Sequence, residues 1–365
     1  MKRFTEKVHH EQQKEVVWVM REDVDEQSDQ AVSKRKSNEE QEDDSLKTPI
    51  VYSKSYGVRF CGMEKLHPFD AAKGSHVFKF LLQNEIFRPG RFYEPSEITK
   101  TELQKVHTRK YLRSLKWSVN AAKISEIPLL LFVPNTFVQR GYLRPMRFQT
   151  AGSILAGSLA IRYGWAINLG GGFHHCCAYK GGGFCPYADI TLLITKTLEE
   201  EPNVETAMIV DLDAHQGNGH ERDFYENEKV FILDMYNASI YPRDHEAKLA
   251  ISCAVELKPR TADGTYLKKL KRSLKYALSE FRPDLLVYNA GTDILLGDPL
   301  GHLCITPEVF LYALGVMERD QFVFATCREE RIPIVMLLSG GYLKSSAKVI
   351  AESIVNLKTK GLLVC

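Results

Sequence analysis

The residues best suited to chemistry lie in the stretch 209–220, which is Ile-Val-Asp-Leu-Asp-Ala-His-Gln-Gly-Asn-Gly-His. An apolar run over residues 207–210 leads into it and predicts a buried parallel strand, so that Asp211, Asp213 and His215 share one face. Two carboxylates and an imidazole gathered there would be costly to bury unless a cation joined them. The pattern favours a metal site, although Asp-x-Asp-x-His alone fits a solvated strand end equally well.

Three further apolar runs are each followed by polar groups beside glycine. The run 165–169 leads into three glycines, a phenylalanine and a His-His pair; 285–288 leads into Asn-Ala-Gly-Thr-Asp; 334–338 leads into Ser-Gly-Gly-Tyr. Parallel sheets place their sites at the carboxyl ends of the strands. Each group alone has an ordinary explanation, as surface histidines, a helix cap or a turn. Together, four such strand ends predict one site, because glycine lets backbones approach closely.

The convergent side chains predict a metal-dependent amide hydrolase without a covalent intermediate. Three of them would hold a zinc-like ion that keeps an open position, as catalytic sites do: Asp213, His215 and Asp293. Others would move the proton and donate to the developing oxyanion: His174 or His175, and Tyr342. Cys176 or Cys177, beside the two histidines, could instead supply a thiolate nucleophile or a thiolate ligand for a metal. However, the eight cysteines lack a Cys-x-x-Cys pair and are expected to be reduced thiols without a catalytic role.

Positioning these groups requires a sheet, and strand-length and helix-length patterns alternate along the chain. The expected strands are 50–52, 165–169, 207–210, 230–233, 285–288 and 334–338, and the expected helices include 101–117, 150–163, 190–198, 266–280 and 307–328. The apolar run 128–134 begins and ends with proline, which favours an edge segment or pocket wall. The alternation predicts a single α/β domain with a mostly parallel central sheet between helices.

Composition bounds the domain organisation and the classes of partner. Residues 1–47 are rich in charged and polar residues and predict a disordered tail, which leaves 48–365 as the catalytic domain. The net charge of +2 creates no strong global field for nucleic acid or an anionic membrane, although local patches remain possible. No run is long enough to span a membrane and no secretory signal is evident. We expect a protein of the nucleus, the cytoplasm or both, which is not secreted and does not bind nucleic acid directly.

Taken together, the motifs resemble those of the zinc-dependent histone deacetylases, which have the arginase/deacetylase fold. The resemblance rests on Gly-Gly-Gly-Phe-His-His (170–175), Asp-Leu-Asp-Ala-His-Gln-Gly-Asn-Gly (211–219), Gly-Thr-Asp (291–293) and Gly-Gly-Tyr (340–342), and it extends over about residues 50 to 360. The segments 67–70, 181–185 and 216–224 look most like the class IV branch.

The resemblance implies a role for each site residue. It implies one zinc ion held by Asp213, His215 and Asp293, paired histidines at His174 and His175 with Asp211 behind the first, an oxyanion donor at Tyr342, and an acyl-lysine tunnel lined by Phe184, Tyr241 and Leu300. It also implies a structural monovalent cation such as K⁺ near Asp211, Asp213, His215, Asp234 and Met235. In one departure, Asn218 stands where class I enzymes usually have an acidic partner for the second histidine.

The function implied is hydrolysis of Nε-acylated lysine in histones or other proteins, with the length of the acyl group left open. The related amidinohydrolases bind two manganese ions through additional aspartates, and Gly-Thr-Asp offers only one. A catalytically silent acyl-lysine-binding or scaffold protein of the same fold is the alternative, and complex partners are unknown. Every catalytic position holds a competent residue, which favours the enzyme.

Overall fold

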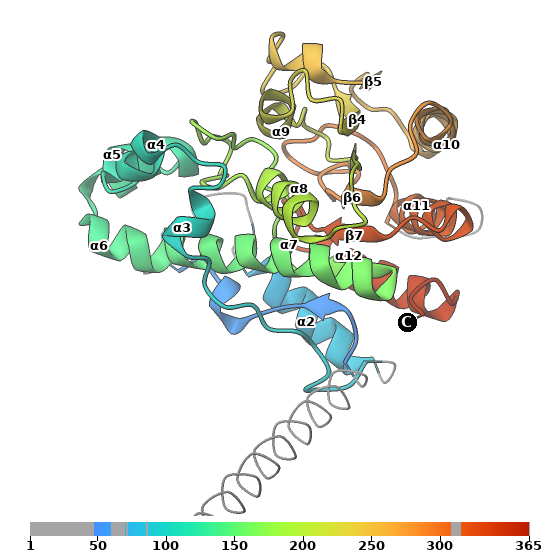
Figure 1. Ribbon diagram of the computed structural model, residues 1–365, viewed down its shortest axis with the longest axis horizontal. Helices are drawn as coiled ribbons and strands as arrows, with labels where there is room; N and C mark the ends of the chain where they lie inside the picture. The colour runs from blue at the N-terminus through green and yellow to red at the C-terminus, as the bar shows by residue number, and fades with distance from the viewer. Residues whose placement is uncertain (1–46, 60–69, 71, 85–86, 308–314, 365) are drawn as a thin grey trace, which may run out of the picture. The chain divides into compact units, whose positions relative to one another are not determined.

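The computed structural model describes residues 47–59, 70, 72–84, 87–307 and 315–364 (Figure 1). Contacts divide the chain into two units, residues 1–47 and residues 48–365, and the fold described here is that of the second unit. The predicted disordered tail lies outside the described residues except for Lys47 and stays a prediction. Among the described helices, none is both long enough and apolar enough to cross a membrane.

Seven strands form one sheet in which every neighbouring pair is parallel. The strands are β1 (Ile50–Val51), β2 (Trp165–Asn168), β3 (Ala207–Asp211), β4 (Val230–Asn237), β5 (Cys253–Leu257), β6 (Leu285–Asn289) and β7 (Ile334–Leu337). Their order is β1-β2-β7-β6-β3-β4-β5. The four strands expected to lead into the site, β2, β7, β6 and β3, are therefore neighbours in the middle of the sheet. The sequence analysis missed β5, an edge strand in which Glu256 interrupts the apolar residues and only Val255 and Leu257 are buried.

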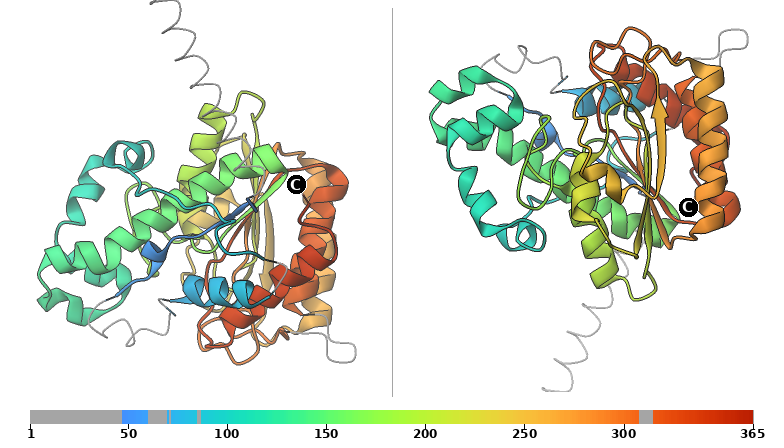
Figure 2. Two further views of the ribbon diagram at one scale, coloured as in Figure 1. Left: turned by 90° about the horizontal axis from the view of Figure 1, so that it is seen from below. Right: turned by 90° about the horizontal axis from the view of Figure 1, so that it is seen from above.

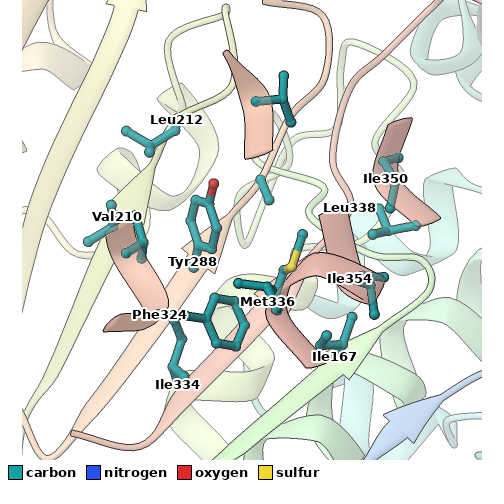
Figure 3. Close-up of a cluster of buried hydrophobic side chains, with 14 of the residues drawn as sticks. Ile167, Val210, Leu212, Tyr288, Phe324, Ile334, Met336, Leu338, Ile350 and Ile354 are labelled. Atoms are coloured by element: carbon teal, nitrogen blue, oxygen red, sulfur yellow. The ribbon is translucent and has the colours of Figure 1, made fainter. Parts of the chain in front are cut away.

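Alternate side chains of the central strands enter two different helical layers. Ile167, Val210, Tyr288 and Met336 belong with Phe324 to the cluster of Figure 3. Their sequence neighbours, such as Ile209, Val287 and Val335, belong to a separate cluster on the opposite face. Both faces are thus apolar, as the uninterrupted apolar runs predicted for a parallel sheet covered on both sides. Each fully buried side chain of this size stabilises the fold by roughly 1.5–3 kcal/mol.

The two layers draw on different parts of the chain. The face with the Figure 3 cluster is covered by α2 (Lys73–Gln83), α10 (Asp263–Glu280), α11 (Val316–Glu330) and α12 (Ser346–Thr359), and the other by α7 (Arg144–Tyr163) and α8 (Asp189–Glu200). Figure 2 shows α10 to α12 gathered on one side of the sheet. The helix predicted at 150–163 is confirmed and begins six residues earlier. Of the helix predicted at 307–328, residues 308–314 lie outside the described residues, and the remainder corresponds to α11, which begins at Val316 after Gly315.

The single helix predicted over 101–117 is wrong. The structure has two short helices, α3 (Lys100–Leu103) and α4 (Arg109–Ser114), each begun by a threonine whose hydroxyl caps the first turn. Between them His107 is buried, with Nδ1 3.2 Å from the Ala178 carbonyl oxygen and Nε2 accepting a hydrogen bond from the Ala188 amide at 3.0 Å. The apolar residues do recur at helical spacing, but the hydrogen bonds of His107 to Ala178 and Ala188 interrupt the helix.

A helical lobe at one end of the domain continues from there. It comprises α5 (Ser118–Ser125), the 3₁₀ helix η3 (Pro128–Phe132), α6 (Asn135–Val138) and the π-helical turn η4 (Gln139–Leu143). The run 128–134 is not an edge segment of the sheet, because Pro128 starts a helical turn, a position that suits its fixed φ and missing N–H. The other reading, a pocket wall, holds for Val133, which lines a hollow at the surface of the domain. Leu130 is buried under this turn, while Leu129, Leu131 and Phe132 are exposed.

Candidate metal and catalytic site

The predicted metal ligands Asp213, His215 and Asp293 meet at the carboxyl edge of β3 and β6. Nδ1 of His215 lies 3.1 Å from Oδ1 of Asp213 and 2.7 Å from Oδ2 of Asp293. One ligand atom from each residue falls within 4.8 Å of the other two, and all three residues are buried. Two oxygens and one nitrogen at this spacing can hold a single divalent ion.

Glycine and backbone donors allow the two carboxylates to come this close. A Cβ at Gly340 would lie 2.5 Å from Oδ2 of Asp213, and one at Gly291 would lie 2.3 Å from the same atom. That oxygen accepts hydrogen bonds from Ser339 Oγ at 2.9 Å and from the Gly340 amide at 2.8 Å. The glycines that follow β6 and β7 are therefore required by the space that Asp213 occupies.

The electrostatics of the three groups suit a dication. Burial raises the pKa of Asp293, and the nearby Asp213 carboxylate raises it further, to about 7. Burial lowers the pKa of His215, but both carboxylates outweigh it and raise the pKa to about 10. A divalent ion can displace the proton from His215 and balance the two carboxylates, so the donor set fits a zinc-type ion.

His174 lies beside this cluster with a carboxylate behind it. Its Nδ1 is 2.9 Å from Oδ2 of Asp211, and its Nε2 is 3.6 Å from Oδ1 of Asp213. Burial lowers the pKa of His174, yet Asp211 and Asp213 raise it to about 9. Asp211 is held in turn by Asn289 Nδ2 and His220 Nε2, at 2.9 and 2.8 Å. His174 is therefore charged near neutral pH.

His175 has a neutral partner instead. Its Nδ1 lies 2.9 Å from Oδ1 of Asn218, and Nδ2 of the same amide donates to Asp244 at 3.1 Å. Asp244 can only accept, which fixes the amide orientation and makes His175 the donor at Nδ1. Burial lowers the pKa of His175, and the positive charges of His174 and His215 lower it further. The ring is therefore neutral, with Nε2 free to accept a proton.

Tyr342 follows β7 and stands edge-on to His215, with ring centroids 6.3 Å apart. Its backbone amide donates to Oδ2 of Asp298 at 2.9 Å, while Oδ1 of Asp298 accepts from the amides of Leu300 and Gly301. Burial, followed by the charges of Asp293 and Asp213, raises the pKa of the Tyr342 hydroxyl well above its usual value. The hydroxyl therefore stays protonated near neutral pH.

The three predicted tunnel residues lie around the carboxyl edge of the sheet, where the metal ligands meet. The ring of Tyr241 meets the ring of His175 edge-on at 4.9 Å. Phe184 has a positive φ of 66°, a strained conformation held by a bond from its amide to the Ile124 carbonyl and one from Tyr142 Oη to its own carbonyl. Leu300 is half-buried and is tied through its amide to Asp298. Phe184 is thus fixed in place by the helical lobe.

A second acidic cluster lies behind Asp211, where the sequence analysis expected a monovalent cation. Asp211, His220 and Asp234 bring their ligand atoms within 4.8 Å of one another. Burial raises the pKa of Asp234, and the charges of Asp211 and Glu221 raise it further. Oδ2 of Asp234 also accepts from the Gly217 amide at 2.8 Å, which ties this cluster to the start of α9 (Asn218–Asp223).

The cysteines beside the histidines do not provide a nucleophile. Cys176 and Cys177 are buried and free of disulfides. Burial raises the pKa of both thiols, and for Cys176 the neighbouring Cys177 adds to the effect. The Cys176 sulfur lies 3.7 Å from the hydroxyl of Tyr111 rather than beside a histidine. A buried thiol of raised pKa is a packing residue.

Several supporting residues had no signal in the sequence. Asp298 positions Tyr342, Asp244 orients Asn218, and Lys73 of α2 donates from Nζ to the carbonyls of Ser339 and Gly340. Each acts over a separation of more than 20 residues. Burial lowers the pKa of Lys73 to about 8 despite the raising effect of Asp213 and Asp293. Its ammonium group therefore holds the turn at Ser339 and Gly340, the two residues that donate hydrogen bonds to Asp213.

Comparison with known proteins gives one family match and several relatives. The family model of the histone deacetylase domain matches residues 67–358. The chain is 50% identical to histone deacetylase 2 of Arabidopsis thaliana over 317 residues, which are 87% of this chain and 80% of that protein. It is 29% identical to the acetoin utilization protein AcuC of Staphylococcus aureus (strain MRSA252), over 71% of this chain and 69% of that protein.

Two solved structures share the fold. The crystal structure of the HDA15 HD domain matches with a TM-score of 0.67 and 22% identity, over 87% of this chain and 89% of that one. That of acetylpolyamine aminohydrolase from Burkholderia pseudomallei matches with a TM-score of 0.63 and 17% identity, over 84% and 98%. From the extent of the family match and the identity to the plant relative, this chain belongs to the histone deacetylase family.

Proposed function

We propose that this protein is a zinc-dependent lysine deacetylase, which hydrolyses the amide of Nε-acylated lysine in histones or other proteins. The observation that carries the proposal is the meeting of Asp213, His215 and Asp293 beside two histidines, of which one is backed by a carboxylate and the other by an amide. Family membership and the name of the Arabidopsis relative support the same reaction. The assignment to the class IV branch rests on the sequence motifs alone.

One zinc ion held by Asp213, His215 and Asp293 would supply a Lewis acid that polarises the acyl carbonyl and acidifies the attacking water. His175 would accept the proton of that water at Nε2, since Nδ1 is committed to Asn218. His174, kept protonated by Asp211, would stabilise the negative charge that develops. Tyr342 would donate its hydroxyl hydrogen to the oxyanion. Phe184, Tyr241 and Leu300 would line the lysine tunnel.

A single ion agrees with the donor set. The second group of possible ligands, Asp211, His220 and Asp234, lies behind His174 and is the candidate place for a structural monovalent cation such as K⁺. Asp211 is already bonded by His174, His220 and Asn289, so it is committed to positioning rather than to a second catalytic ion. We therefore favour one metal over the two-manganese arrangement.

The deciding experiment is a deacylation assay on acetyl-lysine and long-chain acyl-lysine peptides, with and without a chelator. Turnover that chelation abolishes and zinc restores is expected. Tight peptide binding without turnover would instead support the silent acyl-lysine-binding protein. The relative rates on the two peptides would give the acyl preference.

The expected setting follows from the same family. We propose that the protein acts in the nucleus, the cytoplasm or both, on acylated proteins rather than directly on nucleic acid. Imaging of the tagged full chain tests this, and exclusive secretion would contradict it.

A further inference from the structure

The helical lobe carries an exposed apolar surface that the deacetylase site does not use. We call it the lobe tip, and it consists of Trp117, Val119, Leu129, Leu131, Phe132 and Phe137, all of them exposed. Phe132 is 84% exposed, Trp117 69% and Phe137 59%. A group of large apolar side chains in water marks a surface that another molecule covers.

The members of the lobe tip come from three elements that are bonded together. Ser118, next to Trp117, donates from Oγ to the carbonyl of Val133 at 2.8 Å, which brings the start of α5 beside the end of η3. Asn135 of α6 donates from Nδ2 at 3.2 Å to the carbonyl of Leu115, which lies two residues before Trp117. Both views agree that α4, α5 and α6 lie at one end of the domain, away from α10 and α12 (Figure 1, Figure 2).

The charge of this region is strongly positive, although that of the whole chain is only +2. Residues 104–148 contain nine lysines and arginines and one acidic residue, Glu126, so their net charge is +8. Three of the nine pair with glutamates, Lys105 with Glu199 and Arg144 and Arg147 with Glu97. The other six form no ion pair with a residue in the described ranges: Arg109, Lys110, Arg113, Lys116, Lys123 and Arg140.

A cationic hollow adjoins the lobe tip. It has a volume of about 700 Å³, lies between the 3₁₀ helix η1 (Lys54–Tyr56) and the lobe, and shares Phe137 with the tip. Lys54, Arg59 and Arg140 line it together with Arg144, and its described lining includes no carboxylate. Apolar side chains that project outward thus stand beside a hollow suited to phosphate or carboxylate.

We propose that the lobe tip docks on the surface of an anionic lipid bilayer. Aromatic and aliphatic side chains beside lysine and arginine are the composition of segments that lie in the membrane interface. Phe132 and Trp117 would enter the boundary between headgroups and acyl chains, and the hollow lined by Arg59 and Arg140 would receive a headgroup. This contact involves the surface only and requires no membrane span.

An acidic protein segment is the competing occupant, and the shape of the surface disfavours it. Peptide anchors normally enter pockets of the receptor, whereas Phe132 and Trp117 project from this one. Duplex nucleic acid fits still less well, because the apolar tip would be pressed against phosphates. The lobe is also firmly joined to the domain, since the Ile124 carbonyl accepts from the Phe184 amide at 2.8 Å.

The test is sedimentation of the full chain with phosphatidylcholine vesicles that contain or lack phosphatidylserine. Binding should require phosphatidylserine and weaken as salt is added. In a Trp18→Phe background, the tryptophan fluorescence should shift to shorter wavelength on binding, and Trp117→Phe should remove most of that shift, because the remaining Trp165 is buried.

Two variants and a matched control locate the contact. Phe132→Ser should weaken binding about tenfold, the equivalent of burying one large apolar side chain. Arg140→Gln should weaken it about fivefold, the typical effect of one cation near an anionic surface. Leu249→Ser removes a similarly exposed side chain from the 3₁₀ helix η5 (Ala247–Ala250) and should leave binding unchanged.

The proposal is independent of catalysis, since none of these measurements depends on turnover. It is overturned if phosphatidylserine vesicles do not bind, or if Phe132→Ser binds as tightly as the unchanged chain. It is also overturned if a soluble peptide rich in Glu and Leu binds, requires Phe132 and Arg140, and the vesicles do not. That result would assign the lobe tip to an acidic protein partner.

Discussion

Replacement of Asn218 by aspartate tests how the two histidines divide their work. The two rings have matching contacts at Nδ1. In His174 this atom lies 2.9 Å from the carboxylate of Asp211, and in His175 it lies 2.9 Å from the amide oxygen of Asn218. Their pKa values nevertheless move in opposite directions, to about 9 for His174 and downward for His175. The two rings also differ in the other charges around them, and the charge of the partner at Nδ1 is the difference that Asn218→Asp would remove.

The size of the effect follows from the surroundings. A new charge at hydrogen-bond distance typically changes a pKa by about 1–3. Asp244, now 3.1 Å from the amide nitrogen, would repel the new carboxylate, and Arg222, which binds Asp244, would partly neutralise both. We therefore expect the pKa of His175 to rise by about 1–2, toward the lower end of that range.

The assay is the pH profile of kcat/KM on an acetyl-lysine peptide. His175 must be neutral to accept a proton, so a raised pKa moves the ascending limb to higher pH by the same amount. On the ascending limb, the rate of the variant at a given pH should therefore be lower by about tenfold for each pH unit that the limb has moved. At alkaline pH the variant should approach the unchanged enzyme.

Two controls separate charge from lost contact. Asn218→Ala removes the hydrogen bond without adding charge. It should therefore lower the plateau of kcat/KM at alkaline pH and should not move the ascending limb to higher pH. Asp244→Asn in the Asn218→Asp background removes the repulsion and should move the limb further. An unmoved or acid-displaced limb in Asn218→Asp would refute the assignment of His175 as the base or its contact with Asn218.

The other predictions concern the metal, the oxyanion donor, its support and the tail. Asp293→Ala should lose bound zinc and nearly all activity while the circular dichroism spectrum is kept, because the sheet is already packed. Tyr342→Phe should lower kcat about 10²–10³-fold with little change in KM. Asp298→Ala leaves three backbone amides without their acceptor, so it should lower kcat and destabilise the protein by about 1–3 kcal/mol in urea unfolding, with Asp298→Asn milder. Deletion of residues 1–45 should change neither the Tm nor deacylation.

Each of these has an opposing outcome. Stoichiometric zinc with normal turnover in Asp293→Ala would remove that residue from the metal site. Unchanged kcat in Tyr342→Phe would make the tyrosine a packing residue. Normal stability and kcat in Asp298→Ala would mean that solvent replaces its bonds. A Tm several degrees lower after the deletion would show that the tail packs on the domain.

The sequence by itself determined the sheet and the place of the site. Apolar runs such as 207–210 and 334–337 are long and uninterrupted, and a strand buried on both faces requires such a run. Because all strands are parallel, the residues that follow them reach the same edge, whatever the order of the strands. Asp213, Asp293 and Tyr342 could therefore be grouped from their places along the chain.

The tertiary structure decided what surrounds these groups. Asp244 acts on Asn218 across 26 residues and Asp298 acts on Tyr342 across 44, and no local pattern marks either pair. His107 interrupts a periodic helix because its ring is bonded to segments far along the chain. The sequence supplies the ligand types, but distances, protonation and exposure arise only when distant segments share the same space.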